Sequence, residues 1–398
     1  MKKKRILALF LAAVSCLSLA VSASAAGTTT RKATDFKDYD RTAWYAEAVS
    51  AAVDNGLLYG KSSTIIDPNG DMTRAEMAAI INRSFGCYKT ADISQYKDVS
   101  KSKWYYKDVA LAVQMGTYNG RSSSAMAPDS PITRQEAMTV VARALELDYD
   151  AYAKTDLSAF SDRSEISNWA LPYVRAMVGA DYIHGRGKTL APQDNITRAE
   201  FAQIFYNIIG TYIVSKGTYD KDIKGSVLIR TDDVTFKNMT VDGDLIIGCG
   251  AADGKITLDN VTIKGRLLVW GGGVQAVYCN NGTSTPEVIA ARVDDAVKII
   301  FDRDSTLAVI DTIKARITER AKQNKETEII FYDVSGLREA QKQLNAIVAD
   351  NQIDITAPAH LYALVGEQSV KAEFTNNSKN DTYKIEIRRN KDDSLITD

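Results

Sequence analysis

The chain has 398 residues, a formal net charge of −1 and 45% hydrophobic residues. At roughly 150 residues per domain, this length suggests a few domains rather than one. A near-neutral charge without a long run of one sign is unlike an electrostatic nucleic-acid binder, so no nucleic-acid partner is expected. The apolar content suits globular cores and is too low for an integral membrane protein.

The first residues have the pattern of an export signal. Residues 2–5 are basic, residues 6–20 form an apolar stretch, and residues 23–25 are small, as signal peptidase requires. We therefore expect residues 1–26 to be a signal peptide. An alternative is a lipoprotein with Cys16 as the lipidated residue. No later segment reaches the ~20 apolar residues of a membrane helix, so no span is expected in the mature chain.

The mature chain would keep three cysteines, Cys87, Cys249 and Cys279, and two isolated histidines. Because no CxxC pair occurs, a zinc site is not expected. No phosphate-loop, Gly-x-Ser-x-Gly or His-Glu-x-x-His pattern is present, so neither a cofactor nor another metal is predicted. A disulfide between Cys249 and Cys279 is one option that the sequence leaves open.

One unit of the sequence occurs three times, over residues 36–86, 96–147 and 160–210. It starts with an aromatic residue and an Asp, continues with a Trp and a Gly turn, and ends with Thr-Arg-x-Glu. The corresponding residues are the aspartates Asp38, Asp98 and Asp162, the tryptophans Trp44, Trp104 and Trp169, the glycines Gly60, Gly120 and Gly185, and the arginines Arg74, Arg134 and Arg198.

Each copy is predicted to form two helices joined by a glycine-containing loop. The first helix begins near the Trp and the second at the Thr, and both carry apolar residues at helical spacing. Thr-x-x-Glu is a capping box, in which the two side chains satisfy amides at the helix start. The turn glycines are expected to supply a positive φ.

The arginine of each copy lies in the first turn of a helix, where the helix dipole disfavours a cation. Its recurrence indicates a shared role. One interpretation is an anion site made by the guanidinium and the free amides of the helix start. The other is an ion pair with a nearby acid such as Asp38, Asp98 or Asp162. Each Trp is interpreted either as a core residue or as an exposed ring on which a sugar stacks.

The three copies resemble the S-layer homology domain, which occurs as tandem triplets on bacterial surface proteins. The resemblance covers about residues 36–210 and rests on the aromatic-x-Asp start, the Trp, the Gly turn and Thr-Arg-x-Glu. It implies an all-α, pseudo-threefold triplet at the cell wall or in the S-layer. Grooves between its repeats would bind secondary cell-wall polysaccharide, often pyruvylated, and neighbouring surface-layer proteins are further candidate partners.

By position in the family motif, the three arginines would meet the acidic sugar and the three tryptophans would line the grooves. The aspartates and glycines of the motif would shape these grooves. The third copy departs from the pattern, since Asp181 stands where the other copies have Gly56 and Gly116. The resemblance therefore implies an added carboxylate that weakens the third groove.

From about residue 217 the pattern changes from helical to β. Residues 234–247 and 256–269 align without gaps at an offset of 22, which puts Asn238 opposite Asn260. This period predicts rungs of a parallel β-solenoid over residues 217–310, with the two asparagines stacked as a ladder within one turn. Further strands are predicted at residues 287–291 and 297–301.

Residues 311–398 are predicted to form a small α/β region, which makes the whole chain a multidomain α + β protein. Its expected helices lie at residues 312–322 and 336–349. Its expected strands lie at residues 328–332, 370–374 and 383–388.

The leading hypothesis is non-enzymatic: the repeats anchor the protein, and the β-region is displayed as a structural or adhesive module. Some β-solenoids cleave acidic polysaccharides, so a wall-anchored enzyme acting through this region is the alternative, and a lattice-forming surface-layer subunit is a third option. The candidate acids lie at turns beside glycine, where a solvated Asp is ordinary, and His184 lies in a turn as well. These acids are Asp232, Asp233, Asp242, Asp244 and Asp259.

Overall fold

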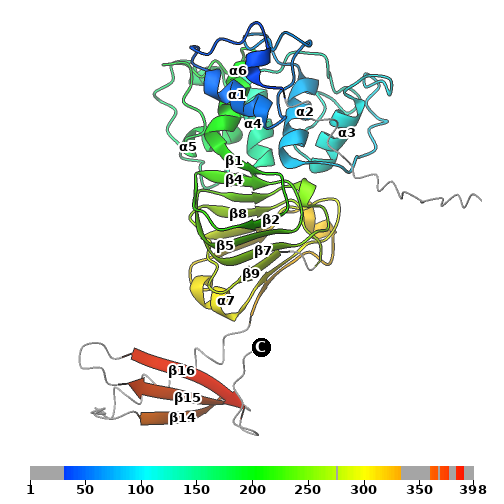
Figure 1. Ribbon diagram of the computed structural model, residues 1–398. Helices are drawn as coiled ribbons and strands as arrows, with labels where there is room; N and C mark the ends of the chain where they lie inside the picture. Colours follow the sequence, from blue (N-terminus) through cyan, green and yellow to red (C-terminus); the bar gives the residue numbers. More distant parts are fainter. Residues whose placement is uncertain (1–30, 275–276, 333–358, 366–367, 376–381, 390–398) are drawn as a thin grey trace, which may run out of the picture.

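The computed structural model describes residues 31–274, 277–332, 359–365, 368–375 and 382–389. A helical part over residues 31–208 packs against a part built of two parallel sheets over residues 209–332 (Figure 1). A third, antiparallel sheet contains β14 (Ala359–Val365), β15 (Gln368–Thr375) and β16 (Thr382–Arg389). Among the described helices, none has the length and apolar character needed to span a membrane.

The helical part contains one helix pair per sequence repeat, as predicted. The pairs are α1 (Ala46–Asp54) with α2 (Arg74–Phe85), α3 (Tyr106–Met115) with α4 (Arg134–Ala144), and α5 (Leu171–Gly179) with α6 (Arg198–Ile208). Short 3-10 turns, η1 (Ala33–Asp35) and η2 (Arg163–Glu165), precede α1 and α5. The predicted capping boxes are present at Thr73, Thr133 and Thr197, which start the second helix of each pair.

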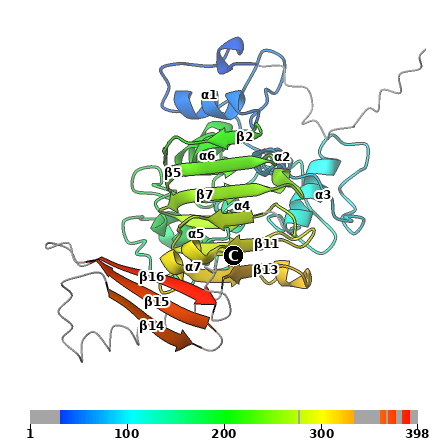
Figure 2. The same ribbon diagram turned by 60° about the horizontal axis from the view of Figure 1, so that its bottom comes forward.

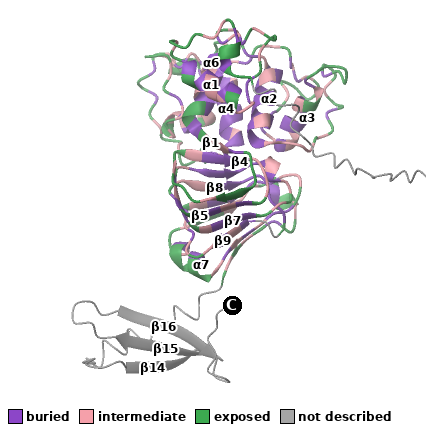
Figure 3. Cartoon of the chain, in the orientation of Figure 1, coloured by how far each residue is buried: buried purple, intermediate pink, exposed green. Residues whose placement is uncertain are grey.

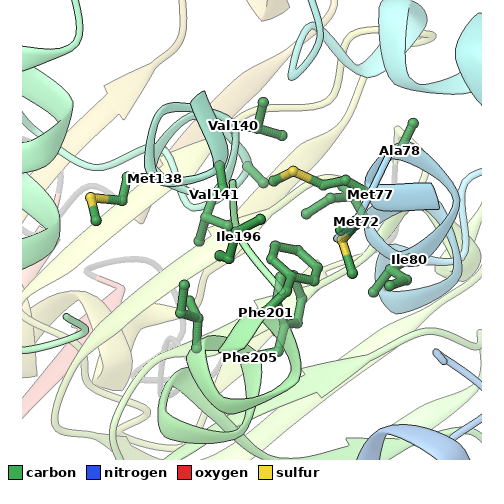
Figure 4. Close-up of a cluster of buried hydrophobic side chains, with 14 of the residues drawn as sticks. Met72, Met77, Ala78, Ile80, Met138, Val140, Val141, Ile196, Phe201 and Phe205 are labelled. Atoms are coloured by element: carbon green, nitrogen blue, oxygen red, sulfur yellow. The ribbon is translucent and has the colours of Figure 1, made fainter. Parts of the chain in front are cut away.

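The three repeats meet at a closed ring of backbone hydrogen bonds. The amide of Met72 donates to the carbonyl of Ile196, that of Ile196 to Ile132, and that of Ile132 to Met72, each at 3.0 Å. All three side chains are fully buried. Figure 4 shows Met72 and Ile196 among apolar side chains of the second helices, such as Phe201. The ring gives the repeats equivalent contacts with one another.

After α6 the chain alternates between two parallel sheets. The first sheet contains, in spatial order, β1 (Ile209–Ile213), β4 (Ser226–Ile229), β6 (Leu245–Ile247), β8 (Arg266–Val269), β10 (Glu287–Ala290) and β12 (Lys314–Ile317). The second sheet, seen in Figure 2, contains β13 (Glu328–Phe331), β11 (Lys298–Phe301), β9 (Val277–Asn280), β7 (Ile256–Ile263), β5 (Val234–Asp242) and β2 (Gly217–Tyr219), with β3 (Ile223–Lys224) beside β5. The first strand follows α6 directly and precedes residue 217, the expected start of the β-region.

The offset of 22 residues is confirmed as strand register. Val234 lies opposite Ile256 between β5 and β7, and Leu245 lies opposite Leu267 between β6 and β8. The Asn ladder is also present, since Asn260 Nδ2 donates to Asn238 Oδ1 at 2.9 Å on the exposed side of the sheet.

The strands expected at residues 287–291, 297–301 and 328–332 are confirmed as β10, β11 and β13, and those at 370–374 and 383–388 lie in β15 and β16. The helix expected at residues 312–322 is wrong. This segment forms β12, paired in parallel with β10, and then the short turn η4 (Ala321–Gln323), because sheet pairing outweighs the local helical pattern. The sequence also missed α7 (Arg303–Val309) and η3 (Cys249–Ala251). Residues 336–349 lie outside the described residues.

The middle strands of the first sheet, β4, β6, β8 and β10, are buried on both faces. Leu228, Ile246 and Leu268 share one core with the helices, whereas their neighbours Leu245 and Leu267 pack in the core between the two sheets. A sheet covered on both sides has continuous apolar strands, which explains the runs Leu-Ile-Ile and Leu-Leu-Val in β6 and β8. The buried residues therefore run from the helices into the sheets without a break (Figure 3).

Arginines of the two-sheet part cap the C-terminal ends of helices. Arg230 donates to Asn55 O after α1 at 2.7 Å and to Arg83 O in α2 at 2.9 Å. Arg266 and Arg320 do the same at α4 and α3, through Leu145 O and Gln114 O. Cations complement the partial negative charge of helix C-termini. The C-termini of these helices therefore face the sheet, and their N-termini point away from it.

Trp270, after β8, provides a test of this contact. It is 2% exposed, its Nε1 donates to Ala144 O at 3.1 Å, and its ring meets Phe85 edge-on. We expect Trp270→Ala to lower the free energy of unfolding by about 3–5 kcal/mol, measured by chemical denaturation. Trp44→Ala, at a 63% exposed position, is the matched control and should stay within about 0.5 kcal/mol of wild type. Equal stabilities of the two variants would contradict a shared core.

Candidate functional site

The three repeated tryptophans lie on the surface, with 63%, 59% and 52% of Trp44, Trp104 and Trp169 exposed. In each repeat the next residue fills the core instead: Tyr45, Tyr105 and Ala170 are 6%, 1% and 0% exposed. The rings of Trp44 and Trp104 stand edge-on to these tyrosines, at centroid distances of 5.5 and 5.4 Å. This exposure excludes the interpretation of the tryptophans as core residues and leaves an indole face available to a ligand.

Each repeated Asp braces a loop of its own repeat. Asp98 accepts hydrogen bonds from the amides of Met126 and Ala127, at 2.9 and 2.7 Å. Asp38 binds the amides of residues 66 and 67 in the same way, and Asp162 binds those of residues 190 and 191. The aspartates therefore fix the loop that precedes each second helix.

Each repeated arginine reaches into the next repeat and binds the loop that the Asp braces. Arg74 Nε donates to Met126 O at 2.9 Å, and its Nη1 pairs with Glu136 at 3.1 Å. Its Nη2 donates to Asn119 O at 3.0 Å. The equivalent contacts join Arg134 to Leu190 O and Glu200, and Arg198 to Ile66 O and Glu76. Repeat one thus binds repeat two, repeat two binds repeat three, and repeat three binds repeat one.

The arginines are only 3–4% exposed. Burial lowers the pKa of Arg134 and Arg198, although guanidinium groups remain charged in proteins. Their acidic partners are the capping-box glutamates of the neighbouring repeat. The interpretation of each arginine as part of an ion pair is therefore confirmed. The partners suggested for it, Asp38, Asp98 and Asp162, are wrong, because these carboxylates bind loop amides.

The amides at the helix starts are not free either. Arg74 N donates to Ser130 O and Ala75 N to Pro128 O, at 3.0 and 2.9 Å. The amides that begin α4 and α6 donate in the same way to carbonyls of residues 194 and 192, and of residues 70 and 68. An anion site on these amides is therefore excluded. The sequence did not reveal these acceptors because they come from another repeat.

The turn glycines are required mainly because a side chain would clash with a neighbouring ring, and less because of their φ angle. A Cβ at Gly60 would lie 2.4 Å from a ring carbon of Phe36, and one at Gly120 would lie 2.5 Å from the ring of Tyr96. Only Gly185 of the three has a positive φ, of 76°. The expectation of a positive φ is therefore wrong for Gly60 and Gly120, where the aromatic residue that starts the repeat covers the glycine.

A cation that was not among the predicted site residues follows each turn glycine. Lys61, Arg121 and Arg186 pair with the capping-box Glu of their own repeat, at 2.5, 3.3 and 2.6 Å. Their side chains are 35%, 43% and 38% exposed. The signal was present in the sequence as a basic residue directly after the glycine in all three copies.

Each capping-box Glu is consequently shared by one exposed and one buried cation. Burial raises the pKa of Glu200, but hydrogen bonds from Arg186 and the Thr197 amide, with the charge of Arg134, hold it below its ordinary value overall. Two cations and one carboxylate leave an excess of positive charge. In the third repeat Asp194 also pairs with Arg186, at 2.8 Å, and offsets that excess.

Residues next to or near the tryptophans take part in the contacts between repeats. Tyr45 hydrogen-bonds Asn69, and Tyr105 Oη donates to Asp129 at 2.7 Å, both in loops that accept the helix start of another repeat. Beside Trp169, the amide of Ser167 donates to Gln135 of repeat two at 2.9 Å. We call each group of one exposed Trp, one exposed cation and one buried Arg–Glu pair an inter-repeat junction.

Asp181 lies at the opposite end of its helix from the junction. It follows α5 with φ 62°, as Gly56 and Gly116 follow α1 and α3 with φ 66° and 78°. Its neighbour Tyr182 hydrogen-bonds Arg266 of the two-sheet part, and its carboxylate lies 3.4 Å from His184 Nδ1. The expectation that Asp181 weakens the third groove is therefore unsupported by its position.

Each candidate acid of the β-region forms an ion pair. Asp232 and Asp233 share Lys216, whereas Lys264 pairs with Asp242, Arg266 with Asp244, and Lys237 with Asp259. Within the part of the chain that the structure describes, no group of three or more His, Cys, Asp or Glu side chains is arranged to hold a metal.

Comparison with known proteins gives one family and several relatives. Residues 35–78, 95–138 and 159–202 match the S-layer homology domain. The chain is 34% identical over 182 residues to the Surface-layer 125 kDa protein of Lysinibacillus sphaericus. The aligned region covers 44% of this chain and 15% of that protein. It is 29% identical over 186 residues to the Cellulosome-anchoring protein of Acetivibrio thermocellus, covering 44% and 38%.

Enzymes are among the relatives as well. The chain is 30% identical over 200 residues to the Amylopullulanase of Thermoanaerobacterium thermosulfurigenes, which covers 47% of this chain and 11% of that enzyme. The matched region therefore spans well under half of each of these relatives. The three family matches coincide with the three helix pairs and their Thr-Arg-x-Glu helix starts. The chain thus carries three tandem S-layer homology domains, and it is an exported protein of the bacterial cell surface, associated with the cell wall.

Proposed function

We propose that the inter-repeat junctions bind an acidic, pyruvylated secondary cell-wall polysaccharide and so anchor the protein non-covalently to the wall. The observation that carries this proposal is the threefold occurrence of an exposed cation on a buried Arg–Glu pair, together with an exposed Trp whose neighbour in sequence contacts another repeat. All three junctions lie at the end of the helical part that faces away from the sheets. A polymer with repeating acidic groups can therefore contact several of them at once, which raises its overall affinity.

The chemistry of the two exposed groups suits such a ligand. The indole face offers a large apolar surface with little conformational entropy to lose, and the apolar face of a sugar ring packs on it. The partly exposed Lys61, Arg121 and Arg186 supply a charge-assisted contact for the carboxylate of a pyruvate group. The name of the Cellulosome-anchoring protein among the relatives agrees with an anchoring role.

The buried arginines, the aspartates and the turn glycines have a different role in this proposal. The guanidinium of Arg74 already binds two carbonyls and a carboxylate of the next repeat. We assign Arg74, Arg134 and Arg198 as positioning residues that hold the junctions together. Asp38, Asp98 and Asp162 and the glycines Gly60, Gly120 and Gly185 then shape the same junctions from within each repeat.

For the two-sheet part we propose a short parallel β-solenoid that is displayed as a structural or adhesive module. The register offset of 22 residues and the alternation of successive strands between the sheets support this architecture. A polysaccharide-cleaving enzyme is the alternative. Its candidate acids are each paired with a Lys or Arg, and two of them, Asp232 and Asp233, lie together on Lys216. Shorter products after incubating the full chain with acidic glycans would favour the enzyme.

The anchoring proposal is tested by sedimenting the mature chain with purified wall sacculi. We expect binding to intact sacculi, loss of binding after chemical removal of the secondary polysaccharide, and release by free pyruvylated polysaccharide. Polysaccharide from which the pyruvate has been removed is the matched competitor and should release much less protein. Equal release by both polymers would refute the role of the acidic group, and binding to stripped sacculi would refute the polysaccharide as the ligand.

The tryptophans are expected to act in binding and not in stability. We expect the triple variant Trp44→Ala/Trp104→Ala/Trp169→Ala to bind sacculi at least about tenfold more weakly, since truncating an anchoring aromatic costs on the order of 1–2 kcal/mol. Its melting temperature should match that of wild type. The control is Tyr149→Ala, because Tyr149 is an exposed aromatic (46%) in the loop after α4, at the sheet-facing end. A triple variant that binds normally would rule out stacking on these rings.

Variants at the exposed cations should affect binding, and variants at the buried arginines should affect stability. We expect Lys61→Gln/Arg121→Gln/Arg186→Gln to weaken binding and to reduce its dependence on salt, with little change in melting temperature. By contrast, Arg74→Met leaves the part-buried Glu136 without its buried partner and should cost about 3–5 kcal/mol in chemical denaturation. If Arg74→Met keeps full stability but loses binding, Arg74 contacts the glycan directly and our assignment fails.

A further inference from the structure

Two cysteines from distant parts of the chain meet where the helical part contacts the sheets. Cys87 follows the end of α2, and Cys249 lies in η3, between β6 and β7. Their Sγ atoms are 3.4 Å apart, although 162 residues separate them in the sequence. The third mature cysteine, Cys279, is fully buried in the core between the sheets. The contact therefore selects Cys87, and not Cys279, as the neighbour of Cys249.

We infer that Cys87 and Cys249 form a disulfide that fastens the first S-layer homology domain to the two-sheet part. This inference is independent of the proposed polysaccharide binding. It differs from the pairing that the sequence left open, between Cys249 and Cys279, because it joins the helical part to the two-sheet part rather than two segments of the two-sheet part.

The backbones around the two cysteines approach each other closely enough for this bond. A Cβ added to Gly86 would lie 2.8 Å from Gly250 Cα, and one added to Gly248 would lie 2.6 Å from Phe85 O. Glycines on both sides thus bring residues 85–87 and 248–250 into direct backbone contact. This contact places the two thiols within reach of each other, as the short separation of a disulfide demands.

The surroundings hold this contact in place. Directly after Cys87, the hydroxyl of Tyr88 donates to Asp294 at 3.3 Å, and Lys89 pairs with the same carboxylate at 3.1 Å. Arg292, which is 1% exposed, pairs in turn with Asp294. On the other side Arg230 binds the carbonyl of Arg83. The segment that carries Cys87 is therefore fixed to the sheets at two sites that flank the thiol.

The chemistry requires an oxidant, for which an exported protein meets disulfide-carrying oxidants or small-molecule disulfides. One thiolate attacks a sulfur of the oxidant and forms a mixed disulfide, and the second thiolate then displaces the reduced oxidant. Two protein thiols lose two electrons and two protons, and the oxidant becomes two thiols. The hydrogen bond to Cys249 and burial raise the pKa of the Cys87 thiol. The thiolate form of Cys87 is therefore scarce in the docked structure.

The pairing is tested on the full mature chain, equilibrated with glutathione disulfide, unfolded without reductant and treated with N-ethylmaleimide. Peptide mass spectrometry should find the Cys87 and Cys249 peptides linked, with the label on Cys279. Labelling of both Cys87 and Cys249, or a link between Cys249 and Cys279, would overturn the inference.

A second measurement tests whether the bond fastens the two parts. We expect reductant to lower the melting temperature of wild type by about 5–10 °C, because a disulfide that closes a long loop stabilises by a few kcal/mol. Cys279→Ala, the matched control, should show the same response to reductant, whereas Cys87→Ser should show none. If reductant leaves the melting temperature of wild type unchanged, the proposed role is overturned. This outcome is decisive even if the Cys87→Ser variant fails to fold.

Discussion

No repeat of the helical part can complete its own second helix, and this constraint organises the structure. The first amides of α2, α4 and α6 need carbonyl groups from another repeat, and so do the arginines that follow the capping threonines. An unpaired buried amide or guanidinium is costly, so each repeat depends on the next. Three repeats close this chain of dependence into a ring, whereas one or two would leave buried donors without acceptors.

Helix direction then determines what each end of the ring can do. The C-terminal carbonyls of α1 to α4 face the sheets, where Arg230, Arg266 and Arg320 bind them. The N-terminal ends face away and carry the exposed tryptophans. Because the middle strands of the first sheet pack against the helices on one face and the second sheet on the other, a load applied at the junctions reaches the two-sheet part through packed side chains. This arrangement suits a protein that holds a displayed module on a wall.

The sequence predicted what depends on local pattern and repetition. Helix starts at Thr73, Thr133 and Thr197 followed from the capping box, and the offset of 22 residues set the strand register correctly. Contacts between repeats could not be predicted, because nothing near Arg74 in the sequence indicates Glu136 or the carbonyl of Met126 as its partner. The same reason hid the Cys87–Cys249 contact. The strand β12 was mistaken for a helix because its own residues show a local helical pattern and no repeat in the sequence indicates that it pairs with β10.

The occupied arginines change how the repeated motif relates to binding. The Thr of Thr-Arg-x-Glu caps its own helix, and the Arg and Glu join neighbouring repeats. The motif therefore identifies a junction without specifying what the junction binds. The groups that remain accessible lie outside it, at the Trp and at the residue after the turn glycine. That residue is Lys61 in one repeat and Arg121 or Arg186 in the others, and only Arg186 has a second acidic partner. If the junctions bind an acidic polymer as proposed, we therefore expect differences in their affinity for an anion to originate at this position, since the motif is the same in all three repeats.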